Sequence, residues 1–379
     1  MSRVVAACLV IAFIAAACSA GAGTPSPSAS RPAASPSAPS PGSPAASPPL
    51  ASPSVSAAPS TSGSASPSQA PARPDAWAAI DAGAGPAARE DHTWTVGDEG
   101  GAWLFGGRDG ATVFDDLWRY DLAADTWERI APSGPAPDGR FGHTSSWIDG
   151  IGLVIWSGQV GSTFFNDLWA FDPAAAAWRE LPAGGPVPAA RYGSCAAVDP
   201  DGRLWISHGF TQDAGRFADT WVHDFATSRW TNVTRPGQLP VARCLHDCLW
   251  TPDGRFLLYA GQTTGIPAIG DLWTRPADGD WMAAPDAEPA ARQLYAITTR
   301  GDDAWVFGGG AEDRSKLGDL WTLDLASLAW RQITLDGPAP SARSAATLIT
   351  DAATDRLLLF GGLTGTGASE ETWALELGG

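Results

Sequence analysis

The sequence predicts an all-β protein whose folded part is a propeller of six blades, preceded by a disordered N-terminal segment. Three observations lead to this fold class. A unit of four landmarks occurs six times, its copies lie 49 to 52 residues apart, and each apolar run is short and bounded by turn residues. Six repeats of a four-stranded unit are typical of a propeller in which each unit forms one blade.

The landmarks follow one another in a fixed order within each copy. A Pro-x-x-Arg segment comes first, an apolar run such as "WLFGG" second, an acid-x-Trp pair third and a lone tryptophan fourth. A short strand is expected after the arginine and at each of the other three landmarks. The arginines, spaced by 51, 51, 52, 49 and 51 residues, are Arg89, Arg140, Arg191, Arg243, Arg292 and Arg343.

Two of the landmarks carry side chains that suit a scaffold. All 19 tryptophans lie between Trp77 and Trp373, and we expect them to supply apolar area to the interfaces between sheets. Six acids in register with six arginines predict charge-assisted ion pairs that fix one blade to the next. These acids are Asp116, Asp167, Asp219, Asp271, Asp319 and Glu371.

The order of the landmarks also predicts how the ring closes. The repeat region, residues 75–379, begins at Trp77 with a fourth-strand tryptophan and ends at "TWALEL" with a third strand. The last blade therefore lacks one strand, and the N-terminal end of the region carries a spare one. We expect residues near 75–80 to pair with residues near 372–377, which removes two exposed sheet edges.

The N-terminal part of the chain has a different composition. Residues 1–18 carry an early arginine and an apolar run, and "AAAC" resembles the cleavage site of a bacterial lipoprotein, which predicts a lipoprotein-type signal with lipidation at Cys18. Residues 19–74 consist mostly of Ala, Pro and Ser, a composition that predicts a disordered linker. We therefore expect a domain anchored to the cell membrane by its N-terminal lipid alone and facing outward, extracellular or periplasmic.

Charge excludes one large class of partner. The formal net charge is −17, and Lys316 is the single lysine. Proteins that bind nucleic acid obtain most of their affinity from basic groups that displace counterions. We therefore expect no DNA or RNA partner. We also expect the protein to be a monomer.

Three cysteines fall within the repeats. Cys244 and Cys248 are four residues apart on an expected strand, roughly 13 Å, so they are too distant to bridge each other. Cys195 lies in the neighbouring blade, from which it could pair with one of them. Buried free thiols are the alternative, and they are the outcome that we expect.

The glycine pair after an apolar strand, followed by the two aromatic landmarks in "WLFGG…DDLWRYD…W", resembles the kelch-repeat family. The resemblance extends from residue 77 to the end of the chain. It implies a propeller like the central domain of galactose oxidase, with the loops between fourth and first strands and between second and third strands on one face. It also implies that the residue after the arginine contacts ligands on that face.

The positions that vary between copies are the candidate binding residues, because a residue kept in every blade serves the ring. Directly after the arginine, the varied residues include Glu90, Phe141, Tyr192 and Gln293. Beyond the glycines lie Arg108, Gln159, Phe210 and Gln262.

Three places after the arginine stand His92, His143, His246 and Tyr295, which we also count as candidate binding residues. Three histidines in one column suggest a metal site, but the same column in the kelch strand usually serves the scaffold. Zinc and copper need their ligands about 2 Å from one centre. We therefore predict neither a metal site nor a cofactor.

The resulting functional hypothesis is a surface-tethered binding module that recognises a protein or a glycan at the cell envelope, without enzymatic activity. One alternative is a carbohydrate-active enzyme. Six-bladed kelch propellers include sialic-acid mutarotases, and in an enzyme of that type Glu90 and an arginine would transfer the proton. An enzyme of the galactose oxidase type would need a copper site of tyrosines and histidines, and no motif in the sequence brings such a set together. The other alternative is a structural component of an envelope complex.

Overall fold

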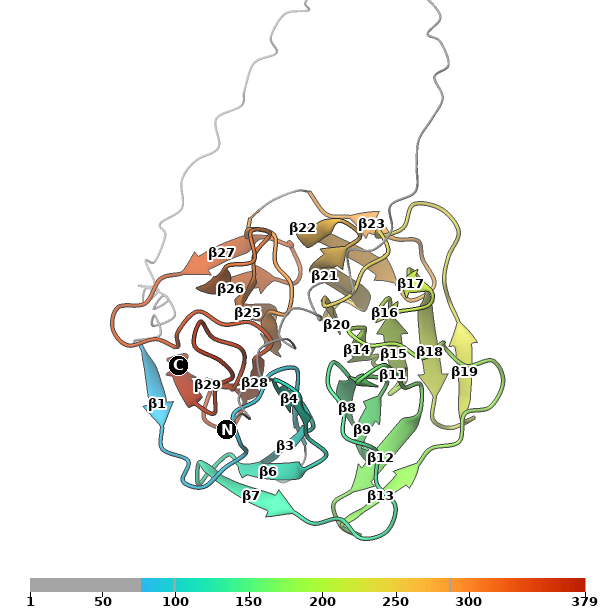
Figure 1. The fold of residues 1–379 in the computed structure, drawn as a ribbon. Helices are drawn as coiled ribbons and strands as arrows, with labels where there is room; N and C mark the ends of the chain where they lie inside the picture. The colour runs from blue at the N-terminus through green and yellow to red at the C-terminus, as the bar shows by residue number, and fades with distance from the viewer. Residues whose placement is uncertain (1–75, 98–99, 286–287, 379) are drawn as a thin grey trace, which may run out of the picture. The chain divides into compact units, whose positions relative to one another are not determined.

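The computed structural model describes residues 76–97, 100–285 and 288–378, and within them six four-stranded antiparallel sheets surround a central axis (Figure 1). The prediction of an all-β propeller with six blades is confirmed. The predicted signal of residues 1–18, the lipidation at Cys18 and the linker of residues 19–74 lie outside the described residues. No helix in the described ranges is long and apolar enough to cross a membrane.

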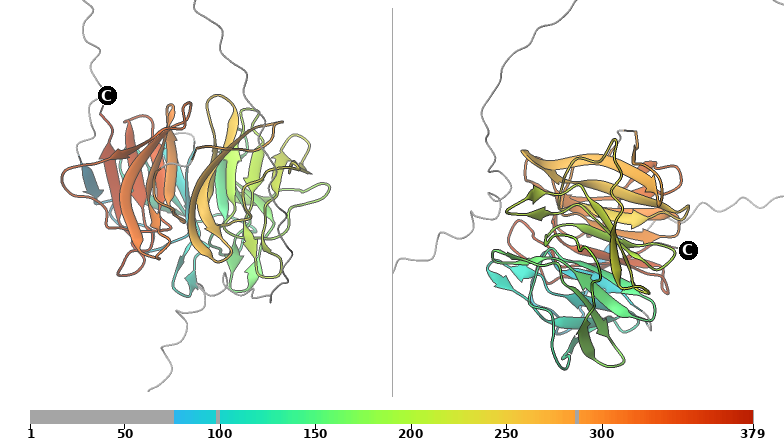
Figure 2. Two further views of the ribbon diagram at one scale, coloured as in Figure 1. Left: turned by 90° about the horizontal axis from the view of Figure 1, so that it is seen from above. Right: turned by 90° about the vertical axis from the view of Figure 1, so that its right-hand side faces the viewer.

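The strands of the first five blades follow one another outward from the axis in chain order, and all strands of the blades run between the two faces of the ring (Figure 2). Blade 1 contains β2 (Thr93–Val96), β3 (Gly101–Phe105), β6 (Leu117–Asp121) and β7 (Thr126–Ile130). Blade 2 contains β8 (Thr144–Ile148), β9 (Gly152–Trp156), β12 (Leu168–Asp172) and β13 (Ala177–Glu180). Blade 3 contains β14 (Cys195–Val198), β15 (Leu204–Ser207), β18 (Thr220–Asp224) and β19 (Arg229–Asn232).

The second half of the ring follows the same plan. Blade 4 contains β20 (Asp247–Trp250), β21 (Arg255–Thr263), β22 (Ile266–Pro276) and β23 (Met282–Ala283). Blade 5 contains β24 (Ala296–Arg300), β25 (Asp303–Gly310), β26 (Lys316–Asp324) and β27 (Trp330–Ile333). Blade 6 contains β28 (Thr347–Asp351), β29 (Arg356–Phe360), β30 (Thr372–Glu376) and, from the other end of the chain, β1 (Trp77–Ile80).

Blade 6 closes the ring as the sequence predicted. Strand β1 pairs antiparallel with β30, with Trp77 opposite Leu375 and Ile80 opposite Thr372. The closing strand thus comes from residues 77–80 and its partner from residues 372–375, within the predicted ranges.

A hairpin joins the second and third strands of each of the first five blades. Within the described residues, blades 1 to 3 form it as separate two-stranded sheets: β4 (Arg108–Asp109) with β5 (Thr112–Val113), β10 (Gln159–Val160) with β11 (Thr163–Phe164), and β16 (Phe210–Thr211) with β17 (Gly215–Arg216). In blades 4 and 5 the main strands themselves continue into the hairpin, with register shifts after Tyr259 and Phe307. These hairpins stand directly after the glycines of the repeat.

The lone tryptophan of most blades packs on the preceding blade. In five described blades it lies against the aromatic residue that precedes the glycines one blade earlier: Trp127 on Phe360, Trp178 on Phe105, Trp230 on Trp156, Trp330 on Tyr259 and Trp77 on Phe307, at 4.8 to 5.7 Å between ring centroids. Blade 3 has Ser207 at that position, and Trp281 of blade 4 packs instead on Phe256 of its own blade, at 5.8 Å. The tryptophans therefore fill the sheet interfaces, as predicted.

The arginines form the predicted ion pairs with the acids, but the pairs lie within one blade and not between two. The guanidinium of Arg140 donates to both carboxylate oxygens of Asp167, at 2.6 and 2.9 Å, and the indole of Trp169 donates to the same carboxylate at 2.9 Å. The contact between blades is made by the backbone of the same arginine: its N–H donates to the carbonyl of Phe114 at 3.2 Å, and its carbonyl accepts from Gly107 at 2.8 Å. The side chain of Arg140 therefore holds its own blade together, and its backbone joins that blade to the preceding one.

A closed ring of backbone hydrogen bonds surrounds the axis two residues after each arginine. Each N–H donates to the equivalent carbonyl of the preceding blade, at 2.7 to 3.1 Å, and the six described members are Asp91, Gly142, Gly193, Leu245, Leu294 and Ala345. Every member has a left-handed backbone, with φ between 51 and 62°. We call these six residues the axial ring.

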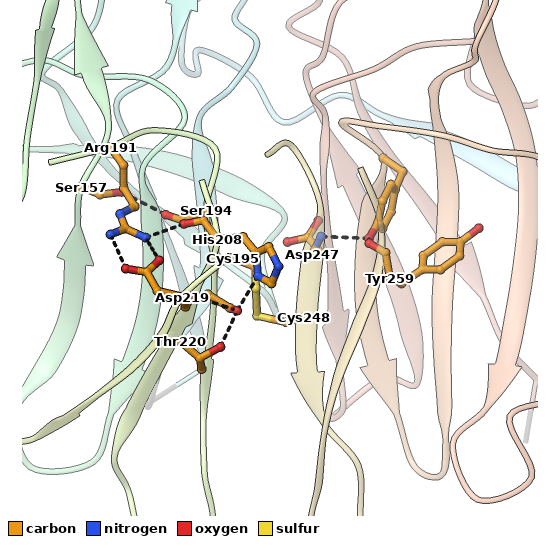
Figure 3. The surroundings of a disulfide bond; sticks show 12 residues. Ser157, Arg191, Ser194, Cys195, His208, Asp219, Thr220, Asp247, Cys248 and Tyr259 are labelled. Carbon is orange, nitrogen blue, oxygen red and sulfur yellow. Dashed lines mark hydrogen bonds and ion pairs between the residues drawn. A yellow bond between two sulfur atoms is a disulfide. The ribbon is translucent and has the colours of Figure 1, made fainter. Parts of the chain in front are cut away.

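One expectation about the cysteines is wrong. Cys195 of β14 and Cys248 of β20 form a disulfide between the innermost strands of blades 3 and 4, with their Cα atoms 5.5 Å apart (Figure 3). Because strands β14 and β20 lie side by side around the axis, these two cysteines are neighbours although they are 53 positions apart in the sequence. The buried Cys244 contacts Gln262, with Sγ 3.8 Å from Oε1.

The axial ring predicts a large cost for a side chain at Gly142. A Cβ there would lie 2.6 Å from Cδ2 of Tyr192, whereas a Cβ at Gly161, which has nearly the same φ, would meet nothing within 4 Å. We expect Gly161→Ala to destabilise the protein by about 1 kcal/mol through backbone strain alone, and Gly142→Ala by about 2–4 kcal/mol through strain and overpacking. Urea unfolding of both variants measures the difference, and equal midpoints would show that Tyr192 gives way without cost.

Candidate functional site

The two varied columns of the repeat meet on one face of the propeller. In every described blade, the residue after the arginine forms an antiparallel backbone bridge with the residue after the glycines. The bridged pairs are Glu90–Arg108, Phe141–Gln159, Tyr192–Phe210, Cys244–Gln262, Gln293–Gly310 and Ser344–Leu363. We call these twelve residues the rim. Eight of the predicted binding residues belong to it.

The rim has an apolar part and a polar part. Phe141, Tyr192 and Phe210 of blades 2 and 3 pack edge to face, with ring centroids 5.9 to 6.3 Å apart. The polar part surrounds a cavity of about 230 Å³, whose lining includes Glu90, Asp91, Arg108, Tyr192, Gln262, Gln293, Arg314, Lys316 and Ser344. We call this cavity the rim pocket. Five predicted residues line it, whereas Phe141, Gln159 and Phe210 do not.

Arg108 lies between two carboxylates at the edge of the rim pocket. Its backbone pairs with Glu90 in both directions, each hydrogen bond being 2.9 Å long, which brings β4 against the segment before β2. The Nη2 atom is then 3.2 Å from Oε1 of Glu90 and 3.2 Å from Oδ2 of Asp91. The guanidinium also stacks on the ring of Phe141, at 4.4 Å from the centroid. One cation therefore serves two buried anions.

The burial of this cluster shifts the affinity of its acids for protons. Burial, reinforced by Asp91, raises the pKa of Glu90 to about 7, although Arg108 and Lys316 oppose the shift. Burial also raises the pKa of Asp91 above its ordinary value against the same two cations. The two acids therefore carry fewer than two negative charges near neutral pH.

Lys316 enters the rim pocket from blade 5. Its Nζ donates to Oγ of Ser344 at 2.6 Å. Burial lowers the pKa of this amine, and the charges of Glu90 and Asp91 raise it in part. Sequence reasoning did not select Lys316 or Asp91. The signal for Lys316 was its uniqueness in the chain, and the signal for Asp91 was its place beside Glu90.

Two buried polar atoms of the rim pocket lack hydrogen-bond partners among the described residues. They are Nε of Arg108, a donor, and Oε1 of Gln293, an acceptor. Arg108 is 9% exposed, so bulk water does not readily reach its guanidinium. A ligand that supplies both an acceptor and a donor would satisfy this pair.

A sequence profile of the KLHDC2/KLHL20/DRC7 kelch-repeat domain matches residues 74–261 and 272–379. The chain belongs to the kelch-repeat family.

Several other proteins resemble the chain over most of its length. A leucine-zipper-like transcriptional regulator 1 homolog of Drosophila melanogaster is 28% identical over 298 residues, which cover 73% of this chain and 29% of that protein. An F-box/kelch-repeat protein of Arabidopsis thaliana is 23% identical over 323 residues, covering 73% and 66%. The Adagio-like protein 3 of Oryza sativa subsp. japonica is 28% identical over 310 residues, covering 72% and 45%. The kelch chain thus spans 29 to 66% of these three eukaryotic relatives, and the closer resemblance to galactose oxidase and to a bacterial lipoprotein stays a prediction.

The remaining predicted residues line a second cavity of the kelch propeller. This axial channel, of about 240 Å³, is lined by the innermost strands and includes His92, His143, His246 and Tyr295. Asp91, Leu245 and Leu294 of the axial ring line both cavities, so the ring separates the channel from the rim pocket.

The channel residues make contacts between blades. His92 and His143 each share a hydrogen bond through Nε2 with a threonine hydroxyl of the preceding blade, Thr347 at 2.7 Å and Thr93 at 2.9 Å. Burial lowers the pKa of His143 to about 3 and that of His92 well below its ordinary value, so both rings are neutral. The hydroxyl of Tyr295 donates to the carbonyl of Tyr259 at 2.7 Å. Among the described residues no three of His, Cys, Asp and Glu are grouped to hold a metal ion.

The pKa of Glu90 predicts a specific dependence of stability on pH. Because folding raises this pKa from 4.5 to about 7, the folded state binds the proton more tightly, and the free energy of unfolding falls as pH rises through that range. Relative to Glu90→Gln, which has no such proton, the wild type should lose about 2–3 kcal/mol between pH 4.5 and 8. Urea unfolding at several pH values measures this, with Asp109→Asn on the exposed side of β4 as control. Parallel pH profiles of wild type and Glu90→Gln would contradict the assignment.

Proposed function

We propose that this kelch propeller is a protein-binding module whose partner inserts a polypeptide segment into the rim pocket. The observation that carries the proposal is the unpartnered pair formed by Nε of Arg108 and Oε1 of Gln293. A peptide group presents one carbonyl acceptor and one N–H donor, the two functions that this pair lacks. Membership of the kelch family supports protein binding in general.

Other residues in and beside the rim pocket support the same kind of ligand. Lys316 and the exposed Arg314 line the pocket from blade 5, where they favour an acidic group of the partner. The packed rings of Phe141, Tyr192 and Phe210 are buried and provide a rigid wall beside it. Rigid aromatic and arginine side chains in a pocket are typical of the few residues that dominate an interface.

Display outside the cytoplasm is the second part of the proposal. The predicted signal, Cys18 and the linker of residues 19–74 would attach the propeller to a membrane surface. The disulfide between Cys195 and Cys248 supports this, because structural disulfides persist mainly in oxidising compartments. A partner in the cell envelope that stays bound would make the protein a structural component of a complex.

The binding proposal is tested with a displayed peptide library and a glycan array probed with the full chain. We expect selected peptides to lose at least about tenfold in affinity in Lys316→Met and in Gln293→Leu, a loss typical of one central interface residue. Arg235→Met, a half-buried arginine outside the rim, is the matched control and should bind like the wild type. Equal binding by all four proteins would exclude the rim pocket, and glycan binding that depends on the same residues would replace a protein partner by a sugar.

A sugar mutarotase is a second candidate, favoured by the pKa of about 7 of Glu90 in a pocket beside Arg108. An acid with this pKa is suited to move a proton at an anomeric centre at neutral pH. If the pocket has this activity, polarimetry of galactose and of N-acetylneuraminic acid will show faster anomerisation that is lost in Glu90→Gln and kept in Asp109→Asn. Rates equal to those in buffer would leave protein binding as the function.

A further inference from the structure

The charges of the rim pocket come from three elements. Glu90 and Asp91 precede β2, Arg108 and the exposed Asp109 belong to β4, and Arg314 and Lys316 belong to the hairpin of blade 5. Tyr192 faces Arg108 from blade 3. Gln262, Gln293 and Ser344 complete the wall without charge. We call Glu90, Asp91, Arg108 and Lys316 the pocket cluster.

The pocket cluster has formally balanced charges but unequal contacts. Both carboxylates share the single atom Nη2 of Arg108, whereas Lys316 donates to the neutral hydroxyl of Ser344. The side chains of Glu90 and Asp91 are 9% and 5% exposed, so water screens their mutual repulsion poorly. An ammonium has three donors, so Lys316 keeps two more for a ligand.

We propose that Lys316 binds an acidic group of the partner peptide, and that the Glu90–Asp91 pair takes up a proton from solvent as this group enters. The proposal rests on the binding function inferred above and adds the chemistry and the regulation of the same site. A third carboxylate in the pocket would share a cavity of about 230 Å³ with two others. Protonation of one of them removes that repulsion and leaves Arg108 with one anion and Lys316 with another.

The direction of the pH effect follows from linkage. An added anion makes each acid of the pair harder to ionise, so the complex holds more protons than the empty pocket. Affinity must then rise as pH falls through the range in which the pair titrates. The pKa of about 7 of Glu90 places that range near neutrality. Uptake of a single proton limits the effect to about tenfold in affinity per pH unit.

The single lysine gives the experiment a clean signal. Incorporation of carbon-13 lysine during expression labels Lys316 alone, because the chain has no other lysine, and it leaves the three donors of the ammonium unchanged. The Hε–Cε signal of Lys316 is followed by NMR from about pH 5 to 9 in the full chain and in Glu90→Gln, with Lys316→Arg to assign it. The probes are a tripeptide that contains glutamate, acetylated and amidated at its ends, and the same peptide with glutamine.

The expected result has two parts. Without peptide, the Lys316 signal should show an inflection near pH 7 that is absent from Glu90→Gln. With the glutamate peptide, the signal should shift at lower peptide concentration at about pH 6 than at pH 8, by several-fold, and Glu90→Gln should remove that difference. The glutamine peptide should require far higher concentrations at both pH values.

The possible failures are distinguishable. An inflection that is missing, or that persists in Glu90→Gln, overturns the proton uptake whatever binds. An inflection without any shift by the glutamate peptide overturns Lys316 as the acid-binding residue. In both cases the peptide-library experiment still decides separately whether the rim pocket binds a protein.

Discussion

The buried arginine at the start of each blade is the interaction on which the rest of the propeller depends. Its guanidinium is buried and donates to an acid of its own blade, to both carboxylate oxygens in the first five blades and to one oxygen of Glu371 in blade 6. Its N–H and C=O groups are bonded to the blade before it. A buried cation is tolerable only when such pairing is complete. The same residue therefore fixes the fold of one sheet and its distance from the next.

This constraint also places the rim. The residue that follows the arginine must stay close to the axis, because the arginine before it is fixed and the residue directly after it belongs to the axial ring. It must therefore lie beside the hairpin that follows the glycines, as the backbone bridges show. The scaffold sets the position of the rim residues, and the sequence of each blade chooses their chemistry.

The sequence was sufficient for the architecture because six copies report the same local structure. The number of blades and the closing strand followed from the order of the landmarks. Relations between blades were harder. The cysteine of blade 4 that meets Cys195 and the acid that each arginine contacts depend on the direction in which the side chains point, and spacing along the chain does not reveal this. Lys316 lines the same pocket as Glu90 because it lies on the hairpin of blade 5, at a position that the landmarks of the repeat do not describe.

The closing strand has a mechanical consequence. The described residues begin at 76 and β1 begins at Trp77, so a pull on the chain at that end acts first on the four residue pairs that hold β1 to β30. If the domain is tethered through that end, a force on the propeller acts on the pairing of β1 with β30 before it acts on any other strand. The indole of Trp77 is buried against Phe307 of blade 5, and this contact must be broken before the strand can be pulled away.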